Sequence, residues 1–129
     1  MTITVDDSTG SGQAISNDVT NVSWNMPSGV QDVTGVNSSG MERLLLLADL
    51  SVTLNGVFND AANLSFAVFK NYRTLAASQV GRTTAIAISG QTLSDEILYS
   101  DFSFQRAADG SFTWSAPGSL SDGGVPAWS

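Results

Sequence analysis

Short runs of alternating apolar and polar residues follow one another along most of this chain. Residues 1–5 alternate Thr with Ile and Val, and residues 14–24 alternate more loosely, with an interruption at residues 16–18. Side chains of a strand point alternately to its two faces, so a period of two predicts strands that each bury one face. A turn at residues 27–29 leads to a further short strand at residues 30–34.

The second half of the chain continues this pattern. Residues 50–58 place Val52 and Leu54 on one face with polar residues between them, and Gly56 is a candidate β-bulge. Two more strand regions follow, at residues 83–89 and 93–106. Asp109-Gly110 predicts a hairpin turn, because this dipeptide tolerates positive φ. The return strand carries three apolar residues on one face, namely Phe112, Trp114 and Ala116.

One segment has helical spacing instead. Residues 37–49 begin with Asn37 and Ser38, which are good N-caps. Apolar residues at i, i+3, i+4 and i+7 would form one buried face, made of Met41, Leu44, Leu45 and Ala48. We therefore expect a helix at residues 37–49. We also expect Leu45→Asp to unfold the domain, because it would put a charge into that face.

The predicted elements define a mainly β protein of about seven strands, this helix and a second short helix at residues 61–72. The fold class we expect is a β-sandwich or partly closed barrel with one flanking α-helix. A length of 129 residues fits one domain. We place the β-sandwich domain at residues 13–116, between an N-terminal arm at residues 1–12 and a Gly-, Ser- and Pro-rich C-terminal arm at residues 117–129.

Composition narrows the functional classes. The chain has no Cys and no His, which excludes disulfides, thiolate metal sites and a Ser-His-Asp triad. Charged residues make up only 13%, against about 25% in average proteins. Twelve acidic residues against five basic ones give a net charge of -7, so a basic nucleic-acid footprint is absent.

Adjacent carboxylates are the main candidates for acid–base chemistry, at Asp6-Asp7 and Asp95-Glu96. Neighbouring residues of an extended chain point apart, so we interpret both pairs as solvated. The sequence leaves open whether the chain has a weak divalent-cation site. With no nucleophile–base pair, we expect a non-enzymatic protein with no catalytic residues, no cofactor and no metal ligands.

Trp128 is an unusual position for a large aromatic residue. It lies one residue from the C-terminus behind a Gly-rich stretch, where an isolated chain could hardly bury it. A terminal aromatic residue in this setting either anchors to a partner or folds back as a plug, and of the two we expect Trp128 to contact another subunit. Four basic residues form no run and are interpreted as solvated or paired with the acidic excess, namely Lys70, Arg73, Arg82 and Arg106.

The chain shows neither a basic and apolar leader nor an apolar run of the ~20 residues that a membrane span needs. Its longest apolar run is residues 44–48. We expect synthesis in a cytoplasm and no membrane partner.

Several stretches together resemble the tail tube proteins of long-tailed bacteriophages, in particular the small tube subunits of actinobacterial phages. The resemblance begins with Asp32-Val33-Thr34-Gly35 and the expected helix from Met41. It continues with the strand of residues 50–61, in which Gly and an aromatic residue precede an acidic turn, and with the later strands at residues 86–90 and 102–104. It is a pattern of spacings that covers residues 30–114.

The resemblance implies a structural virion protein whose subunits form stacked rings, six to a ring, around a hollow conduit for DNA. DNA would pass without specific binding, and an acidic lumen would repel its phosphates. The implied partners are further copies of the chain and the tape measure, terminator and distal tail proteins, within a virion tail assembled in the host cytoplasm. The candidate inter-subunit contacts are Ile3, Val5, Thr74, Arg82, Val125 and Trp128.

Two other interpretations stay open. A related virion protein, such as a tail terminator, a head-tail completion protein or a capsid decoration protein, would form rings that do not stack or trimers on a capsid. A monomeric β-sandwich binding module would instead show a defined ligand pocket.

Overall fold

The computed structural model describes residues 1–37, 39–76 and 79–129. This part of the chain holds ten strands and one short helix. In chain order they are β1 (Thr2–Asp6), β2 (Gly12–Ala14), β3 (Val19–Asn25), β4 (Ser28–Asp32), β5 (Arg43–Ala48), β6 (Ser51–Val57), α1 (Ser65–Phe69), β7 (Arg82–Ile88), β8 (Gln91–Tyr99), β9 (Ser103–Arg106) and β10 (Phe112–Leu120).

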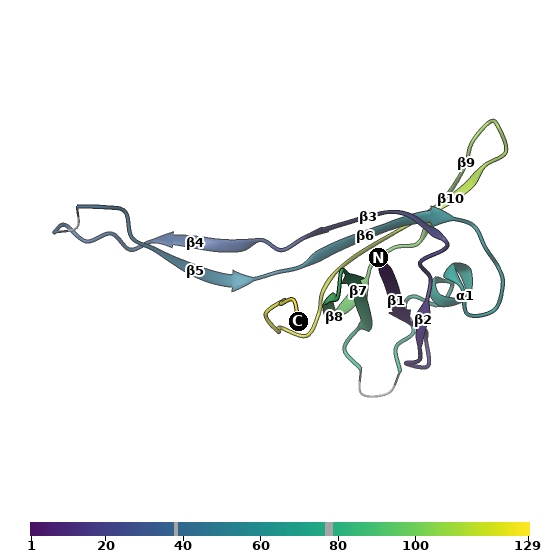
Figure 1. Cartoon of the computed structure of the whole chain (residues 1–129), viewed down its shortest axis with the longest axis horizontal. Coiled ribbons are helices and arrows are strands. Elements are labelled where there is room, and N and C mark those ends of the chain that lie inside the picture. The colour runs from purple at the N-terminus through teal and green to yellow at the C-terminus, as the bar shows by residue number, and fades with distance from the viewer. Residues whose placement is uncertain (38, 77–78) are drawn as a thin grey trace.

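Two antiparallel sheets divide the molecule into a body and a projection. The body is an eight-stranded sheet in the order β2-β1-β7-β8-β10-β6-β3, with β9 paired to β10. Its ladder is not closed into a barrel. The second sheet contains β4 and β5 alone and extends away from the body along the long axis (Figure 1). The expected mainly β, sandwich-like class with one helix is confirmed, and α1 lies within the predicted second helix at residues 61–72 but is much shorter.

The core of the body lies where the alternation predicted it. Val52 and Leu54 of β6 are 2% and 0% exposed, while Ser51 and Val57 at the ends of the strand are exposed. Across the ladder, Trp114 and Ala116 of β10 are buried and pair with Gly56 and Leu54. At about 25 cal/mol for each Å² of apolar surface removed from water, this burial is the main force that holds the body together.

The expected helix at residues 37–49 is wrong. Arg43–Ala48 is strand β5, in which Leu45 pairs with Val30 and Arg43 with Asp32 of β4. An apolar run such as residues 44–47 fits a helix or a strand, and here the backbone bonds of the hairpin decide in favour of the strand. The proposed N-cap Ser38 lies outside the described residues. The turn expected at residues 27–29 is also wrong in part, because β4 begins at Ser28.

The β-bulge lies in β3 rather than at Gly56 of β6. The register of β3 shifts between Val19 and Asn21, opposite Gly56 and Asn55. Gly56 is required for a different reason. A Cβ at this position would lie 2.1 Å from the carbonyl oxygen of Asp18 and 2.7 Å from the Trp114 ring, so no side chain fits there.

Arg82 is a core residue, which corrects its interpretation as solvated. It is 1% exposed and donates to the backbone carbonyls of Val68, Asn71 and Thr74. Burial lowers the pKa of its guanidinium, while the nearby Asp7 charge acts in the opposite direction. Arg82 thereby fastens the end of α1 and the following turn to strand β7.

Candidate assembly surfaces

The projecting hairpin exposes apolar side chains on both of its faces. We call residues 28–48 the arm. Strand residues directly opposite in an antiparallel pair share a face, so Val30 and Leu45 lie together, and they are 54% and 71% exposed. Leu44 and Leu46 lie on the other face and are 54% and 48% exposed. Leu47, which is 91% exposed, lies where the register between β4 and β5 shifts.

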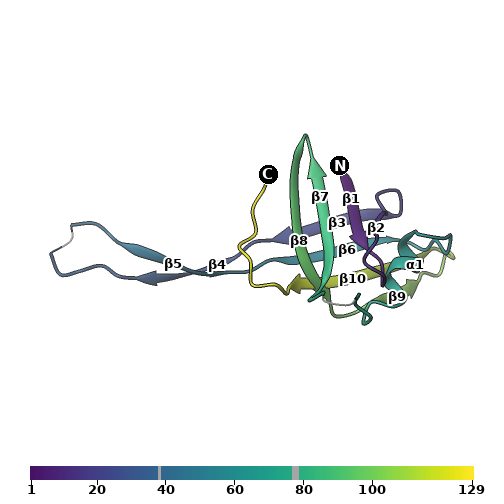
Figure 2. The same ribbon diagram turned by 90° about the horizontal axis from the view of Figure 1, so that it is seen from below.

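The arm pairs with no other strand of the described chain (Figures 1 and 2). Isolated two-stranded hairpins are marginally stable in water. An exposed apolar surface of this kind marks an interaction site in a soluble protein. We infer that the arm is built to be covered.

A second apolar surface lies at the opposite end of the body. Phe58 follows β6, Phe104 belongs to β9 and Phe112 begins β10. We call these three residues the phenylalanine patch. Their rings lie 5.1 to 6.1 Å apart, and they are 39% to 41% exposed. Phe66 of α1 and Phe102 support the patch from within, at ring distances of 4.6 to 6.1 Å from Phe58 and Phe104.

The C-terminal segment folds back on its own chain. Ser129 exchanges two backbone hydrogen bonds with Thr92, of 2.9 and 3.0 Å, and the Trp128 ring packs edge-on against Trp24 at 6.0 Å. The C-terminal segment expected from residue 117 begins later than expected, because strand β10 extends to Leu120. Trp128 keeps 36% of its surface exposed, and only that part is free for a second subunit.

The six predicted contact residues separate into two groups. Ile3, Val5 and Arg82 are between 0% and 3% exposed, so their side chains belong to the core and offer no contact surface. Thr74 and Val125 are exposed, as is the edge of Trp128. Ala77 and Ser78, which come between Thr74 and Arg82 in the sequence, lie outside the described residues. The structure does not bring the six together at one place.

The arm and the phenylalanine patch are the surfaces that the sequence pattern did not reveal. A signal for the arm was present, because residues 44–47 are four leucines in succession and an interior strand of an ordinary half-buried sheet would alternate. No comparable signal marks the patch, since its three residues come from three separate elements.

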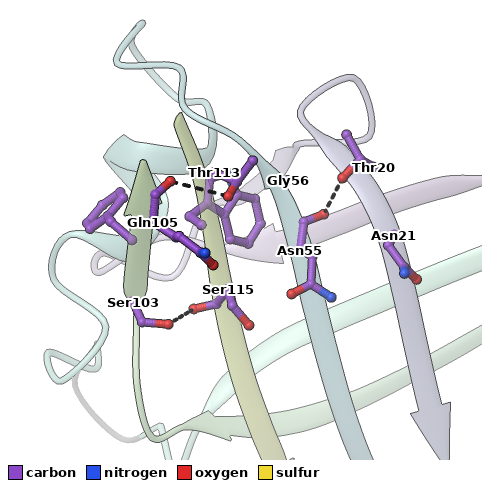
Figure 3. A pocket seen from close by; sticks show the side chains of 10 residues that line it. Thr20, Asn21, Asn55, Gly56, Ser103, Gln105, Thr113 and Ser115 are labelled. Atoms are coloured by element: carbon purple, nitrogen blue, oxygen red, sulfur yellow. Dashed lines mark hydrogen bonds between the residues drawn. The ribbon is translucent and has the colours of Figure 1, made fainter. Parts of the chain in front are cut away.

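A shallow groove on the body is lined mostly by uncharged polar side chains, together with Phe104 and Trp114 (Figure 3). Asn21, Asn55 and Ser115 are cross-strand neighbours in β3, β6 and β10. Their neighbours Thr113 and Ser103 donate to backbone carbonyls at 3.4 and 3.5 Å. The groove lining holds no carboxylate, imidazole or thiol, so it offers hydrogen bonds and no acid–base chemistry.

The carboxylate pairs are not simply solvated, which corrects that interpretation. Asp6 is 8% exposed. Asp7 accepts hydrogen bonds from Thr9, Ser11 and Gln13, which lower its pKa to about 2, the Thr9 hydroxyl having the largest effect. Burial, with the nearby Asp122, raises the pKa of Asp95. Asp7 organises the turn that follows β1, whereas Asp95 and Glu96 lie within strand β8.

The described residues offer neither a metal-binding cluster nor a membrane-spanning helix. Within residues 1–37, 39–76 and 79–129, no three His, Cys, Asp or Glu residues gather closely enough to hold a metal ion. In the same part of the chain no helix has the length and apolar character needed to span a bilayer.

The fold and the two exposed surfaces define a sandwich-like β protein with a projecting hairpin. No protein-family model and no curated protein matches the chain. Several solved structures share its fold, among them two of gene transfer agent particles. One is the tail of an empty gene transfer agent (GTA) particle, from helical refinement with C6 symmetry. It matches with a TM-score of 0.73 and 16% identity over 100% of this chain and 95% of that chain.

The second is the virion of a native gene transfer agent particle. It matches with a TM-score of 0.70 and 14% identity over 98% of this chain and 95% of that chain. At these identities the likeness shows a common fold. It extends over nearly the whole of each chain, the arm included.

Proposed function

We propose that this chain is a structural virion protein, a tail tube subunit that assembles into stacked hexameric rings around a hollow conduit for DNA. The observation that carries the proposal is the arm, whose Leu45 and Leu47 are 71% and 91% exposed on a hairpin without other strand partners in the described chain. The role as a tube subunit is supported by the shared fold with the GTA tail chain.

The arm favours assembly for an energetic reason. Burying a leucine side chain completely contributes about 1.5–3 kcal/mol. The arm has four leucines, three valines and one methionine that are about half exposed or more in the single chain, Val30, Val33, Val36, Met41, Leu44, Leu45, Leu46 and Leu47. Covering them in a contact with another copy would supply several kcal/mol, which competes well with the cost of association.

The ring order and the stacking are taken from the structural neighbour. That tail has C6 symmetry and was refined as a helix. Six copies of this chain per ring, and rings repeated along an axis, are therefore the arrangement we propose. A contact between unlike surfaces can close into a ring or continue as a filament, and a tube needs both kinds of contact.

Charge supports passage of DNA through the tube without binding. Each copy adds seven negative charges to the assembly. Like charge repels the phosphate backbone, and the groove with its Asn, Ser, Thr and Gln side chains adds no cation that would hold a phosphate. We propose a non-enzymatic role in the virion tail, assembled in the host cytoplasm with the tape measure, terminator and distal tail proteins.

The test is direct imaging of the purified protein by negative-stain electron microscopy at rising concentration, with sedimentation velocity on the same samples. Hollow filaments of stacked rings are the expected result. Discrete rings that never stack would replace the tube role with that of a tail terminator or head-tail completion protein. Monomers at every concentration would contradict the proposal and favour a binding module.

A further inference from the structure

Two unpartnered apolar surfaces lie at opposite ends of one elongated chain. The arm extends from one end of the body, while the hairpin of β9 and β10 and helix α1, which carry the phenylalanine patch, lie at the other (Figures 1 and 2). The arm therefore does not cover the patch of its own chain. If the same protein is to bury both surfaces, one copy must supply the arm and another the patch.

We propose that the arm of one copy packs on the phenylalanine patch of a second copy, with the face of Val30 and Leu45 against Phe58, Phe104 and Phe112. This inference rests on the proposed self-assembly and names its contact surfaces. The arm face is chosen because it is the more exposed one, at 54% and 71% for Val30 and Leu45 against 54% and 48% for Leu44 and Leu46.

The patch suits aliphatic side chains. Its three rings meet at interplanar angles of 38° to 76°, so the patch is not a flat stack of rings. Phe66 and Phe102 close the underside. Branched leucine side chains can adapt to such an uneven apolar surface, and close packing contributes dispersion energy beyond the burial of area.

Symmetry favours arm against patch over arm against arm. Arm–arm pairing would be a two-fold contact that closes at a dimer and leaves both patches in water. The arm–patch contact covers both surfaces with one kind of interface, and it repeats from copy to copy. Repetition of that kind is what a filament requires.

Charge has a minor role in this contact. The arm carries Asp32, Glu42 and Arg43, and Arg106 with Asp109 stand beside the patch, so both ends hold charges of both signs. An apolar contact between copies that each carry -7 should strengthen as salt screens their repulsion, over a Debye length of about 8 Å at 0.15 M. An ionic contact would weaken instead.

Cysteine cross-linking tests the pairing, because the chain has no cysteine of its own. Leu45→Cys and Phe104→Cys proteins are purified separately, mixed and treated with a short bismaleimide. The expected product is a heterodimer of the two variants that neither forms by itself. Leu44→Cys, on the other arm face, and Thr113→Cys, on the polar groove, are the matched controls and should cross-link at least several-fold less.

Two outcomes would overturn the inference while leaving the proposed function intact. One is efficient homodimers of Leu45→Cys, which would mean that arms pair with arms. The other is filament formation by the unmodified protein with no Leu45–Phe104 product. An unmodified protein that stays monomeric at every concentration, with no heterodimer, would overturn both proposals together.

A complementation experiment supplies a second, independent readout. Leu45→Lys disables the arm and Phe112→Lys disables the patch, and each variant keeps the other surface intact. Neither should form filaments, and a one-to-one mixture should form heterodimers that stop at two, measured by sedimentation velocity. Thermal unfolding of each variant checks that the body is folded. A mixture that stays monomeric would contradict the arm–patch contact.

Discussion

Leu45→Asp separates the stability of the body from its assembly. The single chain leaves 71% of Leu45 exposed, so less than a third of the side chain is removed from water on folding. At about 1.5–3 kcal/mol for complete burial of a leucine, that fraction contributes less than ~1 kcal/mol. The substitution should therefore leave the body folded, contrary to the expectation from a helix with Leu45 in its buried face.

The same substitution should strongly impair assembly. Covering the remaining 71% of the side chain would contribute about 1–2 kcal/mol at each contact. A carboxylate buried there without a partner adds a further cost. Because 1.4 kcal/mol is a factor of ten in an equilibrium constant, we expect the concentration at which filaments form to rise by about tenfold or more.

The assay has two parts and two control variants. Thermal unfolding of dilute protein measures the stability of the body. Pelleting of filaments at a series of protein concentrations measures assembly. Leu45→Met should resemble the unmodified protein in both, because it keeps the apolar surface. Leu54→Ala, at a position 0% exposed, should cost about 2–5 kcal/mol of stability. The reasoning fails if Leu45→Asp lowers the unfolding temperature as much as Leu54→Ala, or if its filaments form normally.

Three further predictions concern the body. Gly56→Ala should lower the free energy of unfolding by several kcal/mol, because the added Cβ would collide with the backbone and with Trp114. Urea titration measures this change, and unchanged stability would contradict the geometry. Folding depresses the pKa of Asp7 to about 2, below the unfolded value near 3.8. The stability that Asp7 contributes is therefore complete above pH 3.8 and is lost as the pH falls through 2. Between pH 5 and 2, the free energy of unfolding of Asp7→Asn should fall less than that of the unmodified protein. Removing residues 122–129 should leave a folded body and shift the fluorescence of Trp24, because its contact with Trp128 is lost; an unfolded product would show that the segment is essential.

Local pattern was enough to predict most of the body strands, although residues 93–106, expected as one strand region, divide into β8 and β9. In β6 the alternation of Val52 and Leu54 placed the buried face correctly, and the structure starts and ends that strand within one residue of the expected bounds. Asp109-Gly110 specified the β9–β10 hairpin, where Gly110 has φ of 92°. These features depend on a residue and its near neighbours, which a sequence displays directly.

The arm shows where local pattern fails. Four successive leucines have no period, so the positions of Met41 and Ala48 were enough to suggest a helical face. The strand form is selected by pairing with β4, which includes Val30 fifteen positions before Leu45. In a helix the four leucines would have needed a surface to pack on, and the described body provides none beside them.

The candidate surfaces depend still more on the tertiary structure. Phe58 comes together with Phe104 and Phe112 only because β6, β9 and β10 lie side by side. Arg82 changed from an expected surface charge to a core residue because carbonyls of the α1 turn converge on it. Trp128 found an intrachain partner in Trp24, more than a hundred residues away.

The sequence by itself therefore determined the β class, the period and inner face of the body strands, the tight turns, and the absence of thiol and imidazole chemistry. Each of these follows from residue type or from spacing over a few positions. The tertiary structure alone decided which apolar residues stay uncovered, and thus where assembly surfaces lie. Exposure depends on long-range pairing, because a leucine is buried or exposed according to which distant strand packs beside it.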